Sequence, residues 1–165
     1  MVKDQLIPRG IHDPKVLEAF RTVPRHEFIS RESQRIAYDD CPVPIGFGQT
    51  ISQPYMVALM TELLGINQGD RILEIGAGSG YQAAICSYLG AWVYSVERIA
   101  HFVENAYQTL ERLGYISRIQ LKHVDGSKGW AEYAPYRGIL VTAASPAVPD
   151  ELVSQLGEGG KIVIP

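Results

Sequence analysis

The chain contains little cysteine and no pattern that would pair it. Its 165 residues include 2 cysteines, Cys41 and Cys86, with no C-x-x-C spacing and no histidine beside either one. A disulfide framework and a structural zinc site are therefore excluded. The 4 histidines are scattered without the i, i+4 spacing of metal ligands, so we expect no metal centre.

Long apolar runs and an excess of positive charge are also missing. No apolar segment approaches the roughly 20 residues that span a bilayer, and the N-terminal stretch MVKDQLIPRG lacks the apolar core of a signal peptide. The 15 basic and 18 acidic residues give a net charge of −3, without the basic excess typical of nucleic-acid binders. We therefore expect a cytoplasmic protein that binds neither membranes nor nucleic acid. We also expect a monomer.

The stretch RILEIGAGSG, residues 71–80, is the most informative part of the chain. A short apolar run passes directly into a glycine turn and then into a helical pattern, which predicts a strand, a turn and a helix start. Glycine permits positive φ and close approach of a ligand to the backbone. The alternative is a glycine-rich turn that serves packing and binds nothing. The turn consists of small residues only: Gly76, Ala77, Gly78, Ser79 and Gly80.

The spacing of this turn narrows the class of ligand. A dinucleotide fingerprint reads G-x-G-x-x-G, whereas this turn reads G-x-G-x-G, which disfavours a nicotinamide dehydrogenase. Glu74 stands two residues before Gly76, where its charge would repel a pyrophosphate and attract a cationic group. S-adenosylmethionine (SAM) carries an ammonium and a sulfonium. The acidic-x-Gly-x-Gly-x-Gly pattern resembles the first motif of class I SAM-dependent methyltransferases.

Strand and helix patterns alternate along the chain. Helix starts are expected at Asp13-Pro14 and at Pro54, and residues 25–48 are expected to be irregular. The alternation predicts an α/β fold with a doubly wound, mostly parallel, Rossmann-like sheet and helices on both faces. We expect a single domain, in which residues 1–53 form a helical and irregular segment on the substrate side and residues 54–165 form the core. Strands are expected at 71–75, 91–96, 119–124, 138–142 and 161–165.

Candidate site residues lie where these strands end, because ligands of such sheets bind at the carboxyl ends of the strands. Glu97 follows the second strand, about twenty residues past the glycine turn, where an acidic side chain accepts ribose hydroxyls. Asp125 follows the third strand and could accept from an adenine amino group. The alternatives are a solvated charge for Glu97 and an ordinary Asp-Gly turn for Asp125. Ser52 precedes the helix at Pro54, and a capping role is the expectation from the residues alone.

Eight segments together resemble the protein-L-isoaspartate O-methyltransferase family, and GQTISQP and VTAA are the most specific parts of the likeness. Two positions depart from the family pattern, Val124 in place of glycine and Arg137 in place of aspartate. The family usually continues beyond VIP, so the resemblance implies that the C-terminal strands of the fold are missing here. The segments are VPRHEFI (23–29), PIGFGQTISQPYMVALM (44–60), ILEIGAGSGYQ (72–82), VYSVERI (93–99), DGSKGW (125–130), APY (134–136), VTAA (141–144) and QLGEGGKIVIP (155–165).

The resemblance implies methyl transfer from SAM to the free α-carboxylate of L-isoaspartyl residues in damaged proteins, which starts repair through a succinimide and yields S-adenosyl-L-homocysteine. Ser52 would be the active-site serine. Two alternatives remain: a class I methyltransferase acting on a small molecule or RNA, and a SAM-binding module with little or no activity. The resemblance implies that Glu74, Gly76, Ala77, Gly78, Ser79, Gly80, Glu97, Arg98, Asp125 and Gly126 bind SAM. It implies that Thr50, Ile51, Gln53, Thr142 and Ala143 contact the substrate.

Overall fold

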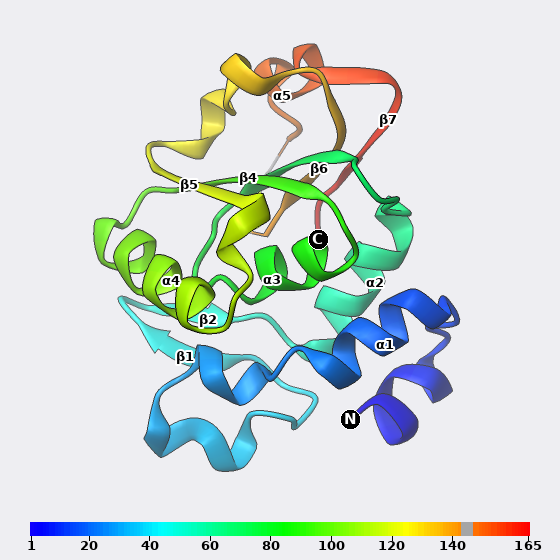
Figure 1. The fold of residues 1–165 in the computed structure, drawn as a ribbon, viewed down its shortest axis with the longest axis vertical. Coiled ribbons are helices and arrows are strands. Elements are labelled where there is room, and N and C mark those ends of the chain that lie inside the picture. Colours follow the sequence, from blue (N-terminus) through cyan, green and yellow to red (C-terminus); the bar gives the residue numbers. More distant parts are fainter. Residues whose placement is uncertain (143–146) are drawn as a thin grey trace.

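A five-stranded parallel sheet forms the centre of the computed structural model, which describes residues 1–142 and 147–165 (Figure 1). The strand order is β5-β4-β3-β6-β7, and every pairing in this sheet is parallel. The chain runs from β3 to β4 and β5 on one side, then returns to β6 and β7 on the other, so the predicted doubly wound fold is confirmed. The strands are β3 (Arg71–Ile75), β4 (Trp92–Glu97), β5 (Ile119–His123), β6 (Tyr136–Val141) and β7 (Leu156–Val163).

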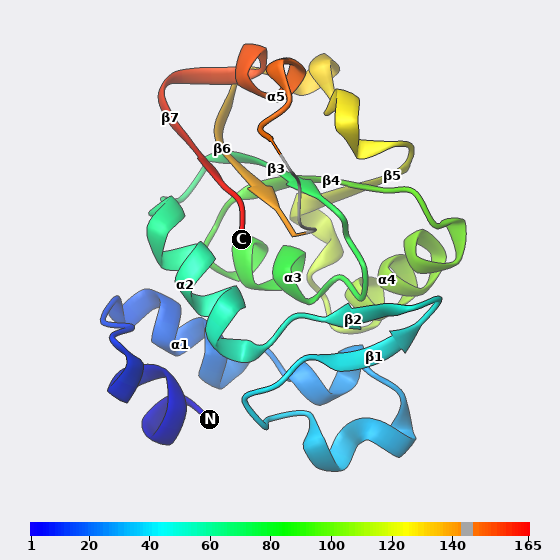
Figure 2. The same cartoon turned by 180° about the vertical axis from the view of Figure 1, so that it is seen from behind.

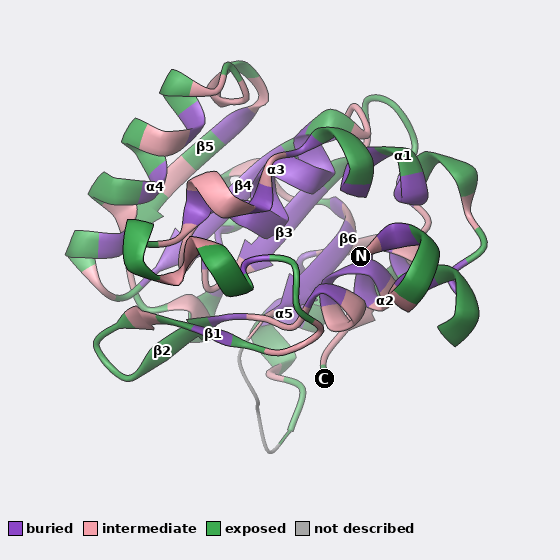
Figure 3. Cartoon of the chain, turned by 90° about the horizontal axis from the view of Figure 1, so that it is seen from below, coloured by how far each residue is buried: buried purple, intermediate pink, exposed green. Residues whose placement is uncertain are grey.

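Helices cover the two faces of the sheet unequally. Figures 1 and 2 show α2, α3 and α4 on one side and α5 on the other. The larger apolar cluster joins α1, α2, α3 and α4 to the sheet. Figure 3 shows α3 and the central strands as its buried interior. The helices are α1 (Pro14–Thr22), α2 (Pro54–Leu64), α3 (Tyr81–Tyr88), α4 (Ala100–Arg112) and α5 (Asp150–Ser154).

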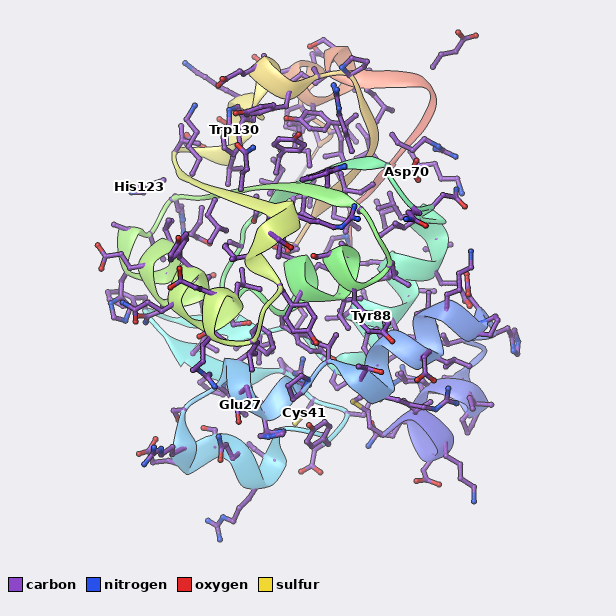
Figure 4. The ribbon with its side chains drawn as sticks, viewed as in Figure 1. Glu27, Cys41, Asp70, Tyr88, His123 and Trp130 are labelled. Atoms are coloured by element: carbon purple, nitrogen blue, oxygen red, sulfur yellow. The ribbon has the colours of Figure 1, made fainter. Side chains whose placement is uncertain are left out.

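Aromatic side chains fill the face of the sheet on which α5 lies. Tyr94 of β4 stacks on Tyr133 with ring centroids 4.3 Å apart, and Trp130 meets Tyr94 edge to face. Figure 4 shows Trp130 on this side, away from Cys41 among the N-terminal turns. Short 3₁₀ turns and aromatic rings therefore replace a long helix after β5.

Helix starts follow the capping signals in the sequence. The Asp13 carboxylate accepts hydrogen bonds from the main-chain N–H groups of Lys15 (2.8 Å) and Val16 (3.4 Å), which are free at the start of α1. Pro54 begins α2, and Gly65 ends it in the left-handed conformation with φ of 67°. Both predicted helix starts are confirmed.

Three segments differ from the expectation. The stretch expected to be irregular contains an antiparallel hairpin of β1 (Val43–Gly46) and β2 (Gln49–Ile51). Strand β7 begins at Leu156 instead of residue 161, and α5 has only 5 residues although the sequence predicts a helix over residues 148–156. None of the helices in residues 1–142 and 147–165 is long and apolar enough to cross a membrane. The remaining short elements are a π-helix at Val2–Leu6 and 3₁₀ helices at Ile7–Arg9, Arg25–Phe28, Arg31–Ile36, Ile116–Arg118, Gly126–Lys128 and Ala131–Tyr133.

Candidate active site

A cavity of about 450 Å³ opens at the carboxyl ends of β3, β4 and β6. The strand order reverses between β3 and β6, which is where open α/β sheets bind their ligands. The glycine turn, the end of β4, the turn after β5 and strand β2 all contribute to the wall. Of the predicted site residues, the cavity is lined by Thr50, Ile51, Ser52, Glu74, Gly76, Ala77, Gly78, Ser79, Glu97, Arg98, Asp125, Gly126 and Thr142.

The glycine turn is held from both sides at its first residue. Gly76 donates its N–H to the Val96 carbonyl oxygen at 2.8 Å, and its φ of 97° lies in the left-handed region. The Thr142 hydroxyl bonds to the carbonyl oxygens of Ile75 (2.9 Å) and Gly76 (2.7 Å). A Cβ at position 76 would lie 2.5 Å from this hydroxyl oxygen, so only glycine fits there.

Glu97 anchors the same turn. Its Oε2 accepts the N–H of Gly78 at 3.0 Å, and its Oε1 accepts the N–H of Ile99 at 2.9 Å. The side chain is only 7% exposed, which contradicts the alternative of a solvated strand-end charge. A carboxylate offers about four acceptor positions, so two remain for ribose hydroxyls. The ribose contact itself stays a prediction.

Glu74 is a buried acceptor with one free oxygen. The Ser95 hydroxyl donates to Oε2, whereas Oε1 has no hydrogen-bond partner among the residues that the structure describes. Burial raises the pKa of Glu74 to about 8, although the Ser95 hydrogen bond acts in the opposite direction. Because an ammonium group beside Oε1 would favour the ionised form, this orphaned oxygen fits the amino-acid end of SAM.

The turn after β5 is an Asp-Gly turn and is also part of the cavity wall. Oδ1 of the exposed Asp125 accepts the N–H of Ser127 at 3.0 Å, a bond that lowers the pKa of Asp125, so the Asp-Gly turn exists. The same turn also lines the cavity. A Cβ on Gly126 would lie 2.5 Å from Cγ2 of Ile75, so no larger residue fits against β3.

Several predicted site residues lie elsewhere. The Gln53 side chain donates to the Asp40 carbonyl oxygen at 2.9 Å and does not line the cavity. Gly80 also lies outside the cavity wall and permits close packing, because a Cβ there would be 3.1 Å from that of Ala106. Ala143 lies outside the described residues. The departure at Arg137 is at the amino end of β6, where its guanidinium donates to the Gly159 carbonyl oxygen at 3.0 Å.

The expected capping role of Ser52 is wrong. Gln53 is the N-cap residue of α2, and no side chain caps this helix. The half-buried Ser52 lines the cavity, and its hydroxyl has no hydrogen-bond partner in residues 1–142 or 147–165. Its hydroxyl is therefore available to a ligand in the cavity.

Several contributors to the site were missed, and Ile45, Tyr81 and Arg25 are among them. Ile45 of β1 lines the cavity, and its Cδ1 lies 3.6 Å from where a Cβ of Gly78 would be, so the hairpin packs over the glycine turn. Tyr81, the first residue of α3, also lines the cavity. Arg25 lies behind Ser52 and donates to its carbonyl oxygen at 2.8 Å. Its place in VPRHEFI, one of the segments that carry the family resemblance, was the available signal.

A parallel sheet in this order, with a glycine turn, an acidic residue after the second core strand and a buried carboxylate beside the turn, defines a class I SAM-dependent methyltransferase. In the part of the chain that the structure describes, no group of three or more His, Cys, Asp or Glu side chains could hold a metal ion. The family model "Protein-L-isoaspartate(D-aspartate) O-methyltransferase (PCMT)" matches residues 1–165. The chain belongs to this family of SAM-dependent enzymes.

Relatives of known sequence or structure agree with this assignment. A protein-L-isoaspartate O-methyltransferase of Synechococcus sp. (strain JA-2-3B'a(2-13)) is 54% identical over 165 residues, which are 100% of this chain and 67% of that protein. A solved protein-L-isoaspartate O-methyltransferase is 36% identical with a TM-score of 0.88, over 97% of this chain and 52% of that one. A Plasmodium falciparum protein described as the same enzyme was solved in complex with S-adenosyl-L-homocysteine. It is 29% identical with a TM-score of 0.84, over 99% of this chain and 82% of that one. The chain thus spans about half of one solved relative.

Proposed function

We propose that this chain transfers a methyl group from SAM to the free α-carboxylate of L-isoaspartyl residues in damaged proteins and peptides. The observation that carries the proposal is the Ser52 hydroxyl, which has no hydrogen-bond partner in residues 1–142 and 147–165 and lines the same cavity as the glycine turn. A hydroxyl at that place can donate to a carboxylate oxygen. The family match over residues 1–165 supports the choice of substrate.

The cavity suits a nucleophile that needs no general base. An α-carboxyl group has a reference pKa of roughly 3.5, so it is already ionised at neutral pH. No histidine lines the cavity among the described residues. Of its carboxylates, Glu97 accepts two main-chain N–H groups and Asp125 accepts one, and the free oxygen of Glu74 would accept from the ammonium of SAM.

SAM supplies the methyl group on its sulfonium. A carboxylate oxygen of the substrate would form the new O–C bond as the C–S bond of SAM breaks, so that the negative charge of the carboxylate and the positive charge of the sulfonium disappear together. Ser52 would hold the carboxylate by donating to it, which replaces a water molecule with a fixed donor. The apolar lining residues Ile51, Val57 and Met60 would exclude further water from the reacting oxygen.

The cofactor would lie across the glycine turn. The main chain of residues 76–79 would lie along its amino-acid end, Glu74 would accept from its ammonium, and Glu97 would accept from its ribose hydroxyls. Arg98 and the Asp125-Gly126 turn would border the adenine. Glu74 Oε1, which has no partner among the described residues, supports this orientation of the cofactor. In this orientation the SAM ammonium, with its three N–H donors, would lie beside that free acceptor.

We further propose that residues 1–165 work as one domain, with residues 1–53 on the substrate side of the core. The hairpin contact between Ile45 and the glycine turn supports this arrangement. We also propose a monomer that works in the cytoplasm without nucleic acid or membrane. Cys86 is a buried free thiol whose pKa burial raises to about 12, and Cys41 is free and half-buried, as suits a reducing compartment.

Product analysis tests the proposal. The chain is incubated with SAM carrying a labelled methyl group and with an isoaspartyl peptide. We expect label first in a base-labile peptide ester, then as methanol when the neighbouring main-chain nitrogen closes the succinimide, and finally a mixture containing the aspartyl peptide. Stable label that never leaves as methanol would point to a different methylated group and would contradict the assigned substrate.

A further inference from the structure

Arg25 ties together three segments that are distant in the sequence. It begins the 3₁₀ helix Arg25–Phe28 and is 0% exposed. Its Nε donates to the Ala37 carbonyl oxygen at 2.7 Å, and its Nη2 donates to the Ser52 carbonyl oxygen at 2.8 Å. Figure 2 shows the light-blue segment with residues 25–36 beside the β1–β2 hairpin that precedes Ser52. One buried guanidinium therefore fixes the backbone at Ser52.

No carboxylate pairs directly with Arg25 among the described residues, although the charge of Asp40 acts on it from a greater distance. None of the ion pairs among the described residues includes Arg25, and its Nη1 has no hydrogen-bond partner there. Asp40 bonds instead to Arg9 and to the N–H of Tyr55. Burial lowers the pKa of Arg25, but guanidinium stays charged at neutral pH. Burying an unpaired cation costs free energy, so stability alone does not explain this residue.

Only one aromatic ring separates Arg25 from the cavity. Its guanidinium carbon lies 5.1 Å from the centre of the Tyr81 ring, and Tyr81 lines the cavity. Phe20 and Phe28 pack edge-on against that ring at 6.0 and 5.4 Å, which fixes its position. The Tyr81 hydroxyl is buried and has no partner among the described residues. The guanidinium thus lies beside both Ser52 and Tyr81, two residues that line the cavity.

We propose that Arg25 is a positioning residue for methyl transfer: it fixes the Ser52 main chain so that the hydroxyl meets the substrate carboxylate. Its unpaired positive charge lies close enough to favour an anionic substrate in the cavity. This inference rests on the proposed function. A rigid two-point contact is what guanidinium supplies and a single ammonium does not, so Arg25 is not interchangeable with lysine.

A double-mutant cycle between Arg25 and Ser52 tests the inference. The kcat for an isoaspartyl peptide is measured at saturating SAM for the natural chain, Arg25→Met, Ser52→Ala and the double variant, each corrected for folded fraction. We expect Arg25→Met to lower kcat by about ten- to a hundred-fold when Ser52 is present and by less than about three-fold in the Ser52→Ala background. Arg25→Met should also raise the KM for the anionic peptide, with SAM affinity changed by less than about two-fold.

Two further variants separate positioning from stability. Leu152→Ala removes a fully buried side chain from the opposite face of the sheet and serves as a control for destabilisation. It should leave kcat per folded molecule unchanged. Arg25→Lys keeps the charge, so it should retain the low KM but not the full kcat. It also replaces Arg25→Met in the cycle if that variant does not fold.

Hydrogen exchange provides a readout that does not depend on activity. Arg25→Met should increase deuterium uptake by the main-chain amides of residues 49–53, and Leu152→Ala should not. Equal effects of Arg25→Met on kcat in both Ser52 backgrounds, or unchanged exchange at residues 49–53, would overturn the inference while the proposed function stands. If the natural chain methylates no isoaspartyl peptide, the proposed function fails, and the exchange experiment still decides whether Arg25 fixes the segment.

Discussion

Replacing Glu97 should damage two properties that can be measured separately. Glu97→Ala removes the acceptors of the Gly78 and Ile99 N–H groups, which are 3.0 and 2.9 Å away. Hydrogen bonds to a charged group contribute about 1.5–3 kcal/mol each, and water entering through the cavity would recover part of that. We therefore expect the free energy of unfolding to fall by about 2–4 kcal/mol without ligand. Urea unfolding followed by circular dichroism measures this loss.

The loss of cofactor affinity has a different origin. If Glu97 accepts the ribose hydroxyls, Glu97→Ala should weaken S-adenosyl-L-homocysteine by about 1–3 kcal/mol, or roughly five- to 150-fold. Calorimetry with this ligand and with its 2′,3′-dideoxyribose analogue isolates the contact. The natural chain should prefer the ligand with hydroxyls, and the variant should bind both ligands alike.

Glu97→Gln sharpens the same test. Both carboxylate oxygens accept N–H groups, so one side of a glutamine amide must turn its NH₂ donor toward another donor. We expect a loss of unfolding free energy of about 1–3 kcal/mol even though the shape is kept. A Glu97→Ala variant that still prefers the hydroxylated ligand as strongly as the natural chain would refute the ribose assignment. Unchanged stability in both variants would refute the anchoring role.

Three other perturbations follow from the geometry. Ser52→Ala should lower kcat by roughly ten- to a thousand-fold and change stability little, because its hydroxyl has no partner in the described structure; full turnover by the folded variant would contradict its role. Gly76→Ala should abolish binding of S-adenosyl-L-homocysteine, since its Cβ would lie 2.5 Å from the Thr142 hydroxyl oxygen. The control variant Gly10→Ala also has a positive φ, 93°, but its Cβ meets no atom within 4 Å, so it should cost only backbone strain. Equal calorimetric affinities of the two variants would contradict this prediction. Burial raises the pKa of Glu74 from its ordinary value of 4.5 to about 8 in the folded chain. The resulting stability contribution is present below pH 4.5 and is lost as pH rises through 8, so Glu74→Gln should flatten the pH dependence of urea unfolding. If the SAM ammonium ionises Glu74, binding at pH 7 should release a proton, which calorimetry in buffers of different ionisation enthalpy would measure.

Local signals explain why most of the core could be predicted. The glycine turn after Ile75 and the proline starts of α1 and α2 depend on a few neighbouring residues, and the sequence contains all of them. The expected parallel sheet followed from alternation. Strand β7 was placed too late, because Gly157 and Gly159 interrupt its apolar pattern although its backbone pairs with β6.

Non-local contacts explain what could not be predicted. The β1–β2 hairpin has strands of 4 and 3 residues and contains Pro44, so no alternation develops. Arg25 resembled a surface charge because its acceptors, the carbonyl oxygens of residues 37 and 52, are distant in the chain. The cavity brought Ser52 and the glycine turn together, but Gln53 turned toward Asp40. Ser52 and Gln53 are neighbours in the sequence, but only Ser52 lines the cavity.

The most direct test of the central claim compares two peptides of one sequence, one with L-isoaspartate and one with L-aspartate at the same position. The initial rate of methyl transfer from tritiated SAM is measured for each peptide at equal concentration. We expect esterification of the isoaspartyl peptide at a rate about a hundred-fold or more above that of the aspartyl peptide, because only the isoaspartyl residue presents a free α-carboxylate within the chain to Ser52. Equal rates, or bound SAM with no transfer to the isoaspartyl peptide, would contradict it.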